Sequence, residues 1–145
     1  MDFFSAMEIS ASGLTAERER VNVASSNVAN AHTTRSANGG PYKRRDVVLS
    51  SQPQSPLLPG GLAGKREQIF SVAVDKITED TRPPRLEYDP GHPDANAQGY
   101  VAYPNVNVVE EMVDMITASR AYQAGMTALD AAVSLSEKSL SIGGK

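Results

Sequence analysis

Residues 107–142 read NVVEEMVDMITASRAYQAGMTALDAAVSLSEKSLSI and contain one sustained heptad repeat. The seam positions alternate in steps of four and three, and all but two are apolar: Val108, Met112, Met115, Ser119, Tyr122, Met126, Leu129, Val133, Ser136 and Leu140. A repeat averaging about 3.5 residues keeps a narrow stripe on a partner only if the helices supercoil left-handedly. The pattern therefore predicts a coiled-coil helix, which Asn107 and Glu110 can cap at its start and Gly143 ends.

The first 30 residues carry a sparser version of the same repeat. Its apolar positions are Phe4, Met7, Leu14, Val21 and Val28. Asn27 and Asn30 stand where the repeat stops, and asparagine can adopt the left-handed conformation that closes a helix. We expect a helix from about residue 3 to about residue 27, shorter than the C-terminal one.

All nine prolines lie between Pro41 and Pro104. Because proline breaks helix interiors, this predicts two helical flanks around a non-helical middle. The predicted division is an N-terminal helix in 1–32, a small β/loop domain in 33–104 and a C-terminal helix in 105–145. Short strands are expected over residues 42–49, 69–74, 86–88 and 100–103, and a mobile loop at about 50–66. The last two strands can pair around the turn-rich residues 89–93.

The predicted fold class is mainly α: N- and C-terminal helices form a coiled-coil pair beside a small, irregular, β-containing middle domain. Burial of the seam alone falls short of the entropy lost in ordering so long a helix. The shorter N-terminal helix also offers few large side chains to cover it. Two interpretations remain open at this point, an intramolecular helical hairpin and helices that assemble with neighbouring subunits.

Composition argues against several classes of function. The net charge of −3 gives no broad electrostatic reason to expect a nucleic acid or an anionic membrane as partner. The absence of cysteine excludes thiolate metal sites and a cysteine nucleophile. No apolar run approaches the length of a membrane span, and the first residues lack the pattern of a cleaved secretory signal peptide.

Motifs for catalysis or ligand binding are also weak. Residues 60–65, GGLAGK, are similar to the end of a phosphate-binding loop, but the residue before them is not the first glycine that this motif requires. Arg66 also replaces the Ser or Thr that binds magnesium. His92 with Asp89 and Asp94 matches no established metal motif. We therefore expect no catalytic residue, no metal and no cofactor.

Four segments resemble the axial proteins of the bacterial flagellum, the family of rod, hook and hook-associated subunits. Residues 24–31 (ASSNVANA) with 41–43 (PYK) are similar to its N-terminal signature, and residues 111–124 (EMVDMITASRAYQA) to its C-terminal signature. Residues 88–93 (YDPGHP) and 99–106 (GYVAYPNV) resemble the proximal-rod members. The residues that carry this signature are Asn27, Asn30, Pro104, Asn105, Glu111, Arg120, Ala121 and Tyr122. Gly125 departs from the family's usual Asn and favours a local bend.

The resemblance implies a structural subunit of the periplasmic proximal rod, the drive shaft that surrounds the export channel. It implies that the terminal helices pack into an inner tube, with the middle segment outside. The implied partners are copies of itself, other rod proteins, the adaptor between the MS ring and the rod, and the flagellar type III export apparatus, which exports such subunits without cleaving a signal peptide. Alternatives are another axial subunit and a non-flagellar coiled-coil adaptor. The implied interface residues are Phe4, Met7, Leu14, Val21, Val28, Val108, Met112, Met115, Tyr122, Met126, Leu129, Val133 and Leu140.

Overall fold

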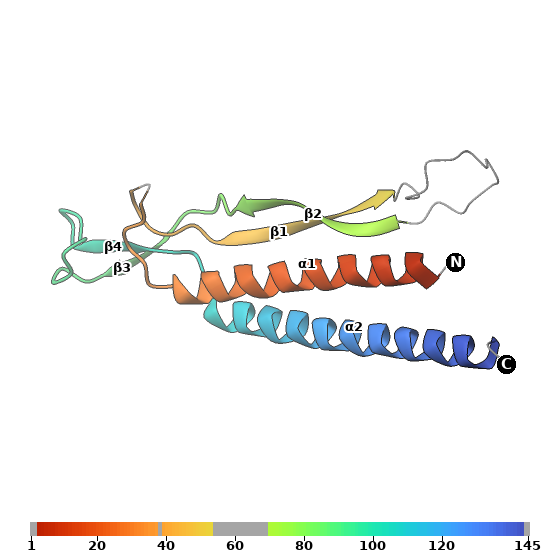
Figure 1. Cartoon of the computed structure of the whole chain (residues 1–145). Coiled ribbons are helices and arrows are strands. Elements are labelled where there is room, and N and C mark those ends of the chain that lie inside the picture. Colours follow the sequence, from red (N-terminus) through yellow and green to blue (C-terminus); the bar gives the residue numbers. More distant parts are fainter. Residues whose placement is uncertain (1–2, 38, 54–69, 144–145) are drawn as a thin grey trace.

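A computed structural model describes residues 3–37, 39–53 and 70–143 of the chain, with side chains from residues 5 to 141 of that range (Figure 1). Two helices flank a middle segment of short strands. In chain order the elements are α1 (Phe3–Ala29), β1 (Arg45–Pro53), β2 (Phe70–Glu79), β3 (Arg85–Tyr88), β4 (Tyr100–Tyr103) and α2 (Val108–Gly143). The two terminal helices and the small antiparallel sheets between them agree with the predicted class.

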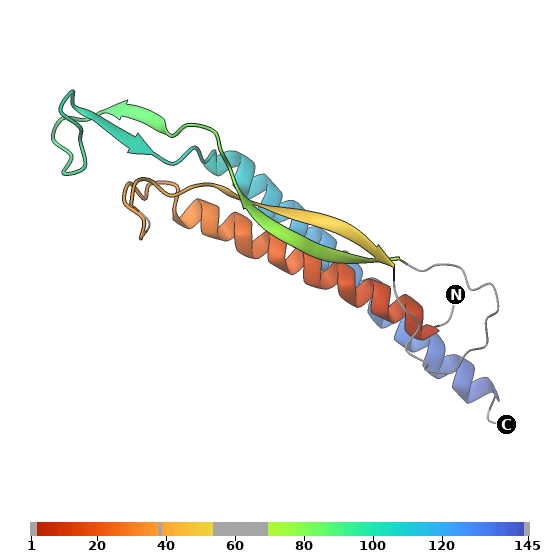
Figure 2. The same ribbon diagram turned by 90° about the horizontal axis from the view of Figure 1, so that it is seen from above.

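The two helices lie side by side and run in opposite directions (Figures 1 and 2). Two contacts set their register: Asn27 is hydrogen-bonded to Glu111, and the side chain of Leu14 lies against Gly125. By this register the start of α1 lies level with a residue near 136 of α2, at about 1.5 Å per residue in both helices. The last turns of α2 therefore continue past the N-terminal end of α1, as Figure 1 shows.

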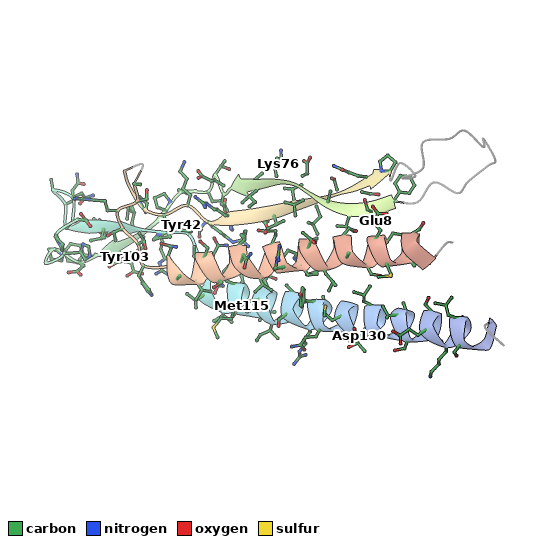
Figure 3. The ribbon with its side chains drawn as sticks, in the orientation of Figure 1. Glu8, Tyr42, Lys76, Tyr103, Met115 and Asp130 are labelled. Atoms are coloured by element: carbon green, nitrogen blue, oxygen red, sulfur yellow. The ribbon has the colours of Figure 1, made fainter. Side chains whose placement is uncertain are left out.

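Strands β1 and β2 form an antiparallel ribbon along α1, on the side opposite α2 (Figures 1 and 2). Their register runs from Arg45 opposite Glu79 to Pro53 opposite Phe70, with a shift between Val48 and Leu49. The Val72 amide donates a 3.2 Å hydrogen bond to Ser12 of α1. Helix α1 is thus the middle layer, and the far side of the ribbon carries polar side chains such as Lys76 (Figure 3).

Strands β3 and β4 form a second antiparallel pair, with Leu86 opposite Ala102, as the sequence predicts. The pair lies beyond the end of α1 where the chain leaves that helix (Figure 1). Gly99, next to β4, has φ +82, and a Cβ there would come within 2.8 Å of the Tyr88 ring. This turn therefore needs glycine for both its backbone and its space.

Some predicted boundaries in the middle segment are wrong. The first strand occupies Arg45–Pro53 instead of 42–49, so residues 50–53, which we assigned to a mobile loop, are part of a strand. The rest of that loop, from residue 54 to 66, lies outside the described residues. The second strand extends to Glu79, five residues beyond its predicted end, while residue 69 is not described. Serine and proline can occupy a strand in a two-stranded ribbon, because an exposed edge tolerates proline.

Helix ends are closed by asparagine side chains. Asn107 Oδ1 accepts a 3.1 Å hydrogen bond from the amide of Val109, which confirms Asn107 as the N-cap of α2. At the end of α1, Asn30 Nδ2 donates a 2.9 Å hydrogen bond to the carbonyl oxygen of Ser26. The expected left-handed closure is wrong, because no described residue other than glycine has a positive φ.

The apolar core is small and consists of alanine and valine. The buried apolar residues are Ala16, Val23, Ala24, Ala31, Val101, Val106 and Ala118. Many larger apolar side chains, by contrast, are exposed, and several of them lie on α2. Neither described helix combines the length and apolar character that a membrane span requires.

Candidate functional site

Asn27 and Glu111 form a buried polar pair between the two helices. Only 1% of Asn27 and 2% of Glu111 is exposed. Asn27 Nδ2 donates one 2.8 Å hydrogen bond to Glu111 Oε2 and another to the carbonyl oxygen of Arg45. Its Oδ1 accepts from the hydroxyl of Tyr42 and from the amide of Arg45, each at 2.9 Å. Every donor and acceptor position of the Asn27 side chain is therefore satisfied.

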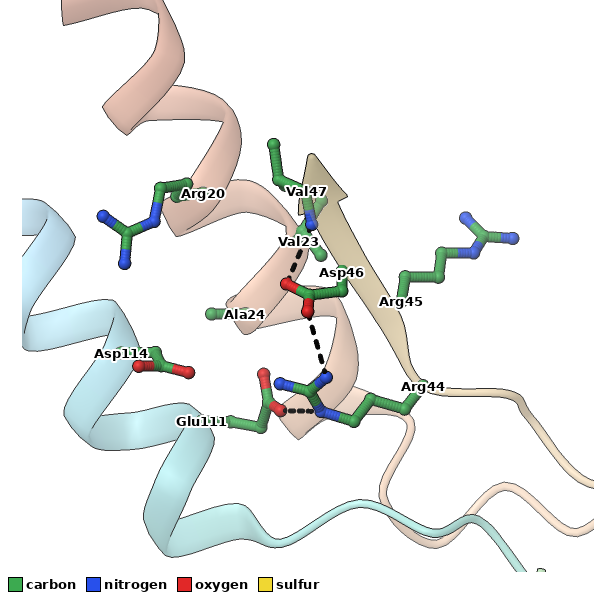
Figure 4. Close-up of a pocket in the computed structure, with 9 residues that line it drawn as sticks. All are labelled: Arg20, Val23, Ala24, Arg44, Arg45, Asp46, Val47, Glu111 and Asp114. Atoms are coloured by element: carbon green, nitrogen blue, oxygen red, sulfur yellow. Dashed lines mark hydrogen bonds and ion pairs between the residues drawn. The ribbon is translucent and has the colours of Figure 1, made fainter. Parts of the chain in front are cut away.

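Arg44 completes this cluster from the segment that leads into β1. Its Nε donates to Glu111 Oε1, while Nη1 lies 3.7 Å from Asp46 Oδ2 (Figure 4). Burial acts to lower the pKa of the Arg44 guanidinium, but the hydrogen bond and charge of Glu111 outweigh it, so the pKa is raised. Both oxygens of the buried Glu111 carboxylate thus have partners, which offsets much of the free energy of desolvating it.

The cluster of Asn27, Tyr42, Arg44 and Glu111 joins three parts of the chain. Asn27 comes from the last turns of α1, Glu111 from the first turns of α2, and Tyr42 and Arg44 from the connection to β1 (Figures 3 and 4). A cavity of about 40 Å³ adjoins it. Within the described residues, no group of His, Asp or Glu is arranged to hold a metal ion. The cluster therefore has a structural role, because it holds α1, α2 and the segment before β1 together. We call these four residues the interlock.

Helix spacing near the middle of the pair depends on Gly125. A Cβ at this position would lie 2.9 Å from Leu14 Cδ2, closer than side chains approach one another. The sequence favoured a bend here. The structure gives Gly125 a different role, since it leaves room for the Leu14 side chain between the helices.

The predicted seam residues fall into two groups. Half-buried members are Met7, Leu14, Val21, Val28, Val108, Met115, Tyr122, Leu129 and Val133. Exposed members are Met112, Met126 and Leu140, the last with 75% of its surface accessible. The side chain of Phe4 lies outside the described part of the chain. The role of all these residues in subunit contacts stays a prediction.

The residues of the flagellar signature are also divided. Asn27 and Glu111 belong to the interlock, Pro104 is buried, and Asn105 and Tyr122 are half-buried. Asn30 bonds to Ser26, as described above. Arg120 and Ala121 are exposed on α2. A signature in the sequence therefore combines residues that hold the subunit together with residues that remain accessible.

A second apolar face of α2 points to solvent. Val109, Met112, Val113 and Ile116 follow the spacing i, i+3, i+4, i+7 and are 69%, 46%, 57% and 49% exposed. This spacing places them on one side of the helix, and Arg120 follows one turn later on the same side. We call these four residues with Arg120 the outer α2 face. Only Met112 and Arg120 of this face were among the residues predicted from the sequence. The other three were missed, although their spacing is visible in the sequence, because one heptad seam was assumed for the helix.

The outer α2 face begins beside an open hollow of about 430 Å³. The hollow lies between the chain after α1, the start of β3 and the first turn of α2. Its lining includes His32, Arg85, Asn105 and Val109. The exposed apolar surface is therefore continuous with a concave, partly basic region.

Comparison with known families finds two models that match the ends of this chain. A family described as "Flagella basal body rod protein" matches residues 7–35. A family described as "Flagellar basal body rod FlgEFG protein C-terminal" matches residues 97–142. The matched regions contain nearly all of α1 and α2.

Full-length relatives are also found. The chain is 41% identical over 151 residues to the flagellar basal-body rod protein FlgC of Borreliella burgdorferi, covering 98% of each chain. It is 44% identical over 149 residues to that of Bacillus subtilis and 40% identical over 143 residues to that of Escherichia coli O157:H7, each with 99% of both chains covered. The similarity extends through the middle segment as well as both helices.

Proposed function

This chain belongs to the FlgC family of flagellar basal-body rod proteins, and from that membership we propose that it builds the rod by packing its terminal helices against those of neighbouring subunits. It is a structural subunit of the proximal rod of the flagellar basal body and not an enzyme. Membership of the rod family fits assembly with copies of itself and with other rod proteins.

The observation that carries this proposal is the apolar surface that the chain leaves uncovered. One part of it is the outer α2 face. Another is the end of α2, where Leu135 and Leu140 are 66% and 75% exposed. We call the part of α2 beyond residue 136, which α1 does not reach, the C-terminal overhang. Neighbouring subunits that cover these surfaces would stabilise the helices by the burial of apolar area.

The finer architecture belongs to the same proposal. Helices α1 and α2 would form a left-handed coiled coil along the predicted seam, and the exposed seam residues Met112, Met126 and Leu140 would contact neighbours. Segments 1–32 and 105–145 would line the inner tube around the export channel, and 33–104 would form the outer domain. The antiparallel packing of the helices and the length of α2 support this arrangement.

Location and specific partners are proposed from family membership. The rod would lie in the periplasm, and its subunits would reach it through the flagellar type III export apparatus without cleavage of a signal peptide. The neighbours would be other rod proteins and the adaptor between the MS ring and the rod.

Removal of residues 137–145 tests whether the overhang is needed for assembly. By the register above, α1 does not reach these residues, so the truncated chain should keep its internal helix pair. We expect cells that carry only this variant to be non-motile and their basal bodies to lack the rod. Circular dichroism of the purified variant should still show both helices. Motility equal to that of the wild type would contradict the proposal.

A matched pair of substitutions compares a seam residue with its neighbour outside the seam. Leu140→Asp and Ser139→Asp add the same charge one residue apart, on an exposed part of α2. Leu140→Asp should impair rod assembly and motility, whereas Ser139→Asp should leave both close to normal. Equal effects of the two variants would argue against a contact at Leu140.

A further inference from the structure

Helix α1 also has a side that no other described part of its own chain covers. Every exposed residue of its described part falls on one row with steps of three and four: Glu8, Ala11, Thr15, Arg18, Asn22, Ser25 and Ala29. Helix α2 and the β1–β2 ribbon occupy the other sides. Most residues of this α1 row are short, and short side chains let another helix approach closely, because the side chains at the contact set the interaxial distance.

The α1 row and the outer α2 face are complementary in size. The outer α2 face offers Val109, Met112, Val113 and Ile116, all large apolar side chains. Along the corresponding length the α1 row offers Ala11 and Thr15, with the longer Arg18 at the end of that stretch. One helix can pack closely into the groove of another when large side chains on the first lie against short side chains on the second.

The two surfaces are also complementary in charge. Glu8 and Arg18 lie ten residues apart along α1, and Glu110 and Arg120 lie ten residues apart along α2. Each separation is about 15 Å at 1.5 Å per residue. Both helices carry the acid first and the base second. Antiparallel packing therefore puts Glu8 opposite Arg120 and brings Arg18 level with Glu110, which lies at the edge of the outer α2 face, about a quarter turn from Val109. None of these four residues makes an ion pair within the described part of the chain.

We propose that the outer α2 face of one subunit packs antiparallel on the α1 row of a second copy of this chain. In this register Glu8 lies opposite Arg120 and Thr15 opposite Val113, while Arg18 is level with Glu110 at the edge of the face. The contact joins two different surfaces, so each copy keeps one of each free. Such a heterologous contact can continue from subunit to subunit into a helical assembly. The inference rests on the proposed function and names the surfaces that carry it.

Cysteine cross-linking tests the register, since the chain has no cysteine of its own. The test variant carries Ala11→Cys and Ile116→Cys in the full-length chain. Within one subunit residue 11 lies level with a residue near 127, about 16 Å along the helices from Ile116, so the two cysteines cannot join. We expect mild oxidation of cells that make this variant to give a ladder of disulfide-linked products, beginning with a dimer of twice the 15.4 kDa chain mass.

The control variant carries Ala11→Cys and Ser134→Cys. Ser134 is exposed on α2 but lies 18 residues from Ile116, about 27 Å along the helix. This control should give little dimer. Equal dimer yields from both variants would overturn the register. A cross-link from the test variant to a different rod protein, in place of the dimer, would show that the partner on this face is not a second copy of this chain.

Charge reversal tests the pairing independently. Glu8→Arg and Arg120→Glu should each weaken self-association of the purified chain about tenfold, because each places like charges opposite one another. An equimolar mixture of the two variants should restore association, since each unlike pair then has opposite charges at both contacts. Sedimentation at high protein concentration measures this, with circular dichroism to confirm folding.

These experiments distinguish failure of the helix pairing from failure of the proposed function. If the mixture associates no better than either variant alone, this helix pairing is wrong. If the pairing is wrong but the chain truncated before residue 137 still fails to build a rod, the proposed function stands. If that truncated chain supports motility, the proposed function itself fails, whatever the cross-links show.

Discussion

Asn27, near the end of α1, donates a 2.8 Å hydrogen bond from Nδ2 to Oε2 of Glu111, in the first turns of α2. The two residues are 84 positions apart in sequence and are the only buried polar residues of the described chain. Buried polar groups that are fully hydrogen-bonded fix one arrangement of the elements that carry them. A subunit that must present its exposed helix faces at a defined angle needs such a fixed arrangement, because its core of alanine and valine is small.

Removing the Glu111 carboxylate should destabilise the subunit strongly. Glu111→Ala leaves Asn27 without one acceptor and Arg44 with only the more distant Asp46, and a buried group left unsatisfied costs about 2–3 kcal/mol. Glu111→Gln keeps an oxygen for Asn27 and should cost less. Urea unfolding followed by circular dichroism measures both variants. A loss below about 0.5 kcal/mol for Glu111→Ala would show that the interlock does not hold the helices, since surface changes fall in that range.

Asn27→Asp should make stability depend on pH in a characteristic way. The new carboxyl would be buried beside Glu111, and both effects raise the pKa of a carboxyl in the folded state. The folded variant then holds a proton that the unfolded chain releases above its ordinary pKa of about 3.9. The free energy of unfolding should therefore fall as pH rises above about 4, relative to the wild type. Unfolding at several pH values checks this, with Asn27→Ala as the control that has no carboxyl.

The sequence predicted the elements whose signals are local. The C-terminal helix, the cap at Asn107 and the pairing of residues 86–88 with 100–103 depend on signals from neighbouring residues, and all three are confirmed. The heptad seam itself stays a prediction. The interlock was out of reach, since Asn27 was interpreted as a helix stop and Glu111 only as a residue of the family signature. Only the approach of distant segments shows that each satisfies the other.

The position of β1 was mispredicted for a related reason. Residues 50–53 are rich in serine and proline, which is typical of loops, but pairing with β2 continues to Pro53. The outer α2 face was missed because a single stripe was expected on each helix. A helix that contacts its own chain on one side and neighbours on another carries two overlapping patterns, and one heptad describes only the first.

Gly99→Ala should damage the β3–β4 hairpin while sparing the helices. The substitution adds a Cβ at φ +82, where L-residues are strained, and brings it 2.8 Å from the Tyr88 ring. Backbone strain of this kind costs about 1–3 kcal/mol. Hydrogen exchange should show faster exchange at the amides of β3 and β4, with little change in α1 and α2. Gly91→Ala, a nearby glycine whose Cβ would meet only Asp89 at 3.5 Å, is the matched control.

Substitution of Gly125 by alanine has two opposing effects on the free energy of unfolding. Alanine favours helix over glycine by about 1 kcal/mol, but its methyl group would lie 2.9 Å from Leu14 Cδ2 and force that side chain to move. Gly125→Ala should therefore change the free energy of unfolding by less than about 1 kcal/mol, because the Leu14 side chain is flexible at its end. Gly125→Leu should cost more than about 2 kcal/mol, since no rotamer change makes room for it.

Leu14 provides the control that separates these effects. In a Leu14→Ala background the space beside residue 125 is open, so Gly125→Ala should gain close to its full helix propensity of about 1 kcal/mol. The difference between its effects in the two backgrounds measures the coupling between the helices at this point. Urea unfolding of the wild type, both single variants and the double variant gives that value. A coupling near zero would mean that Leu14 and Gly125 do not meet, and the register of α1 on α2 would then rest on Asn27 and Glu111 alone.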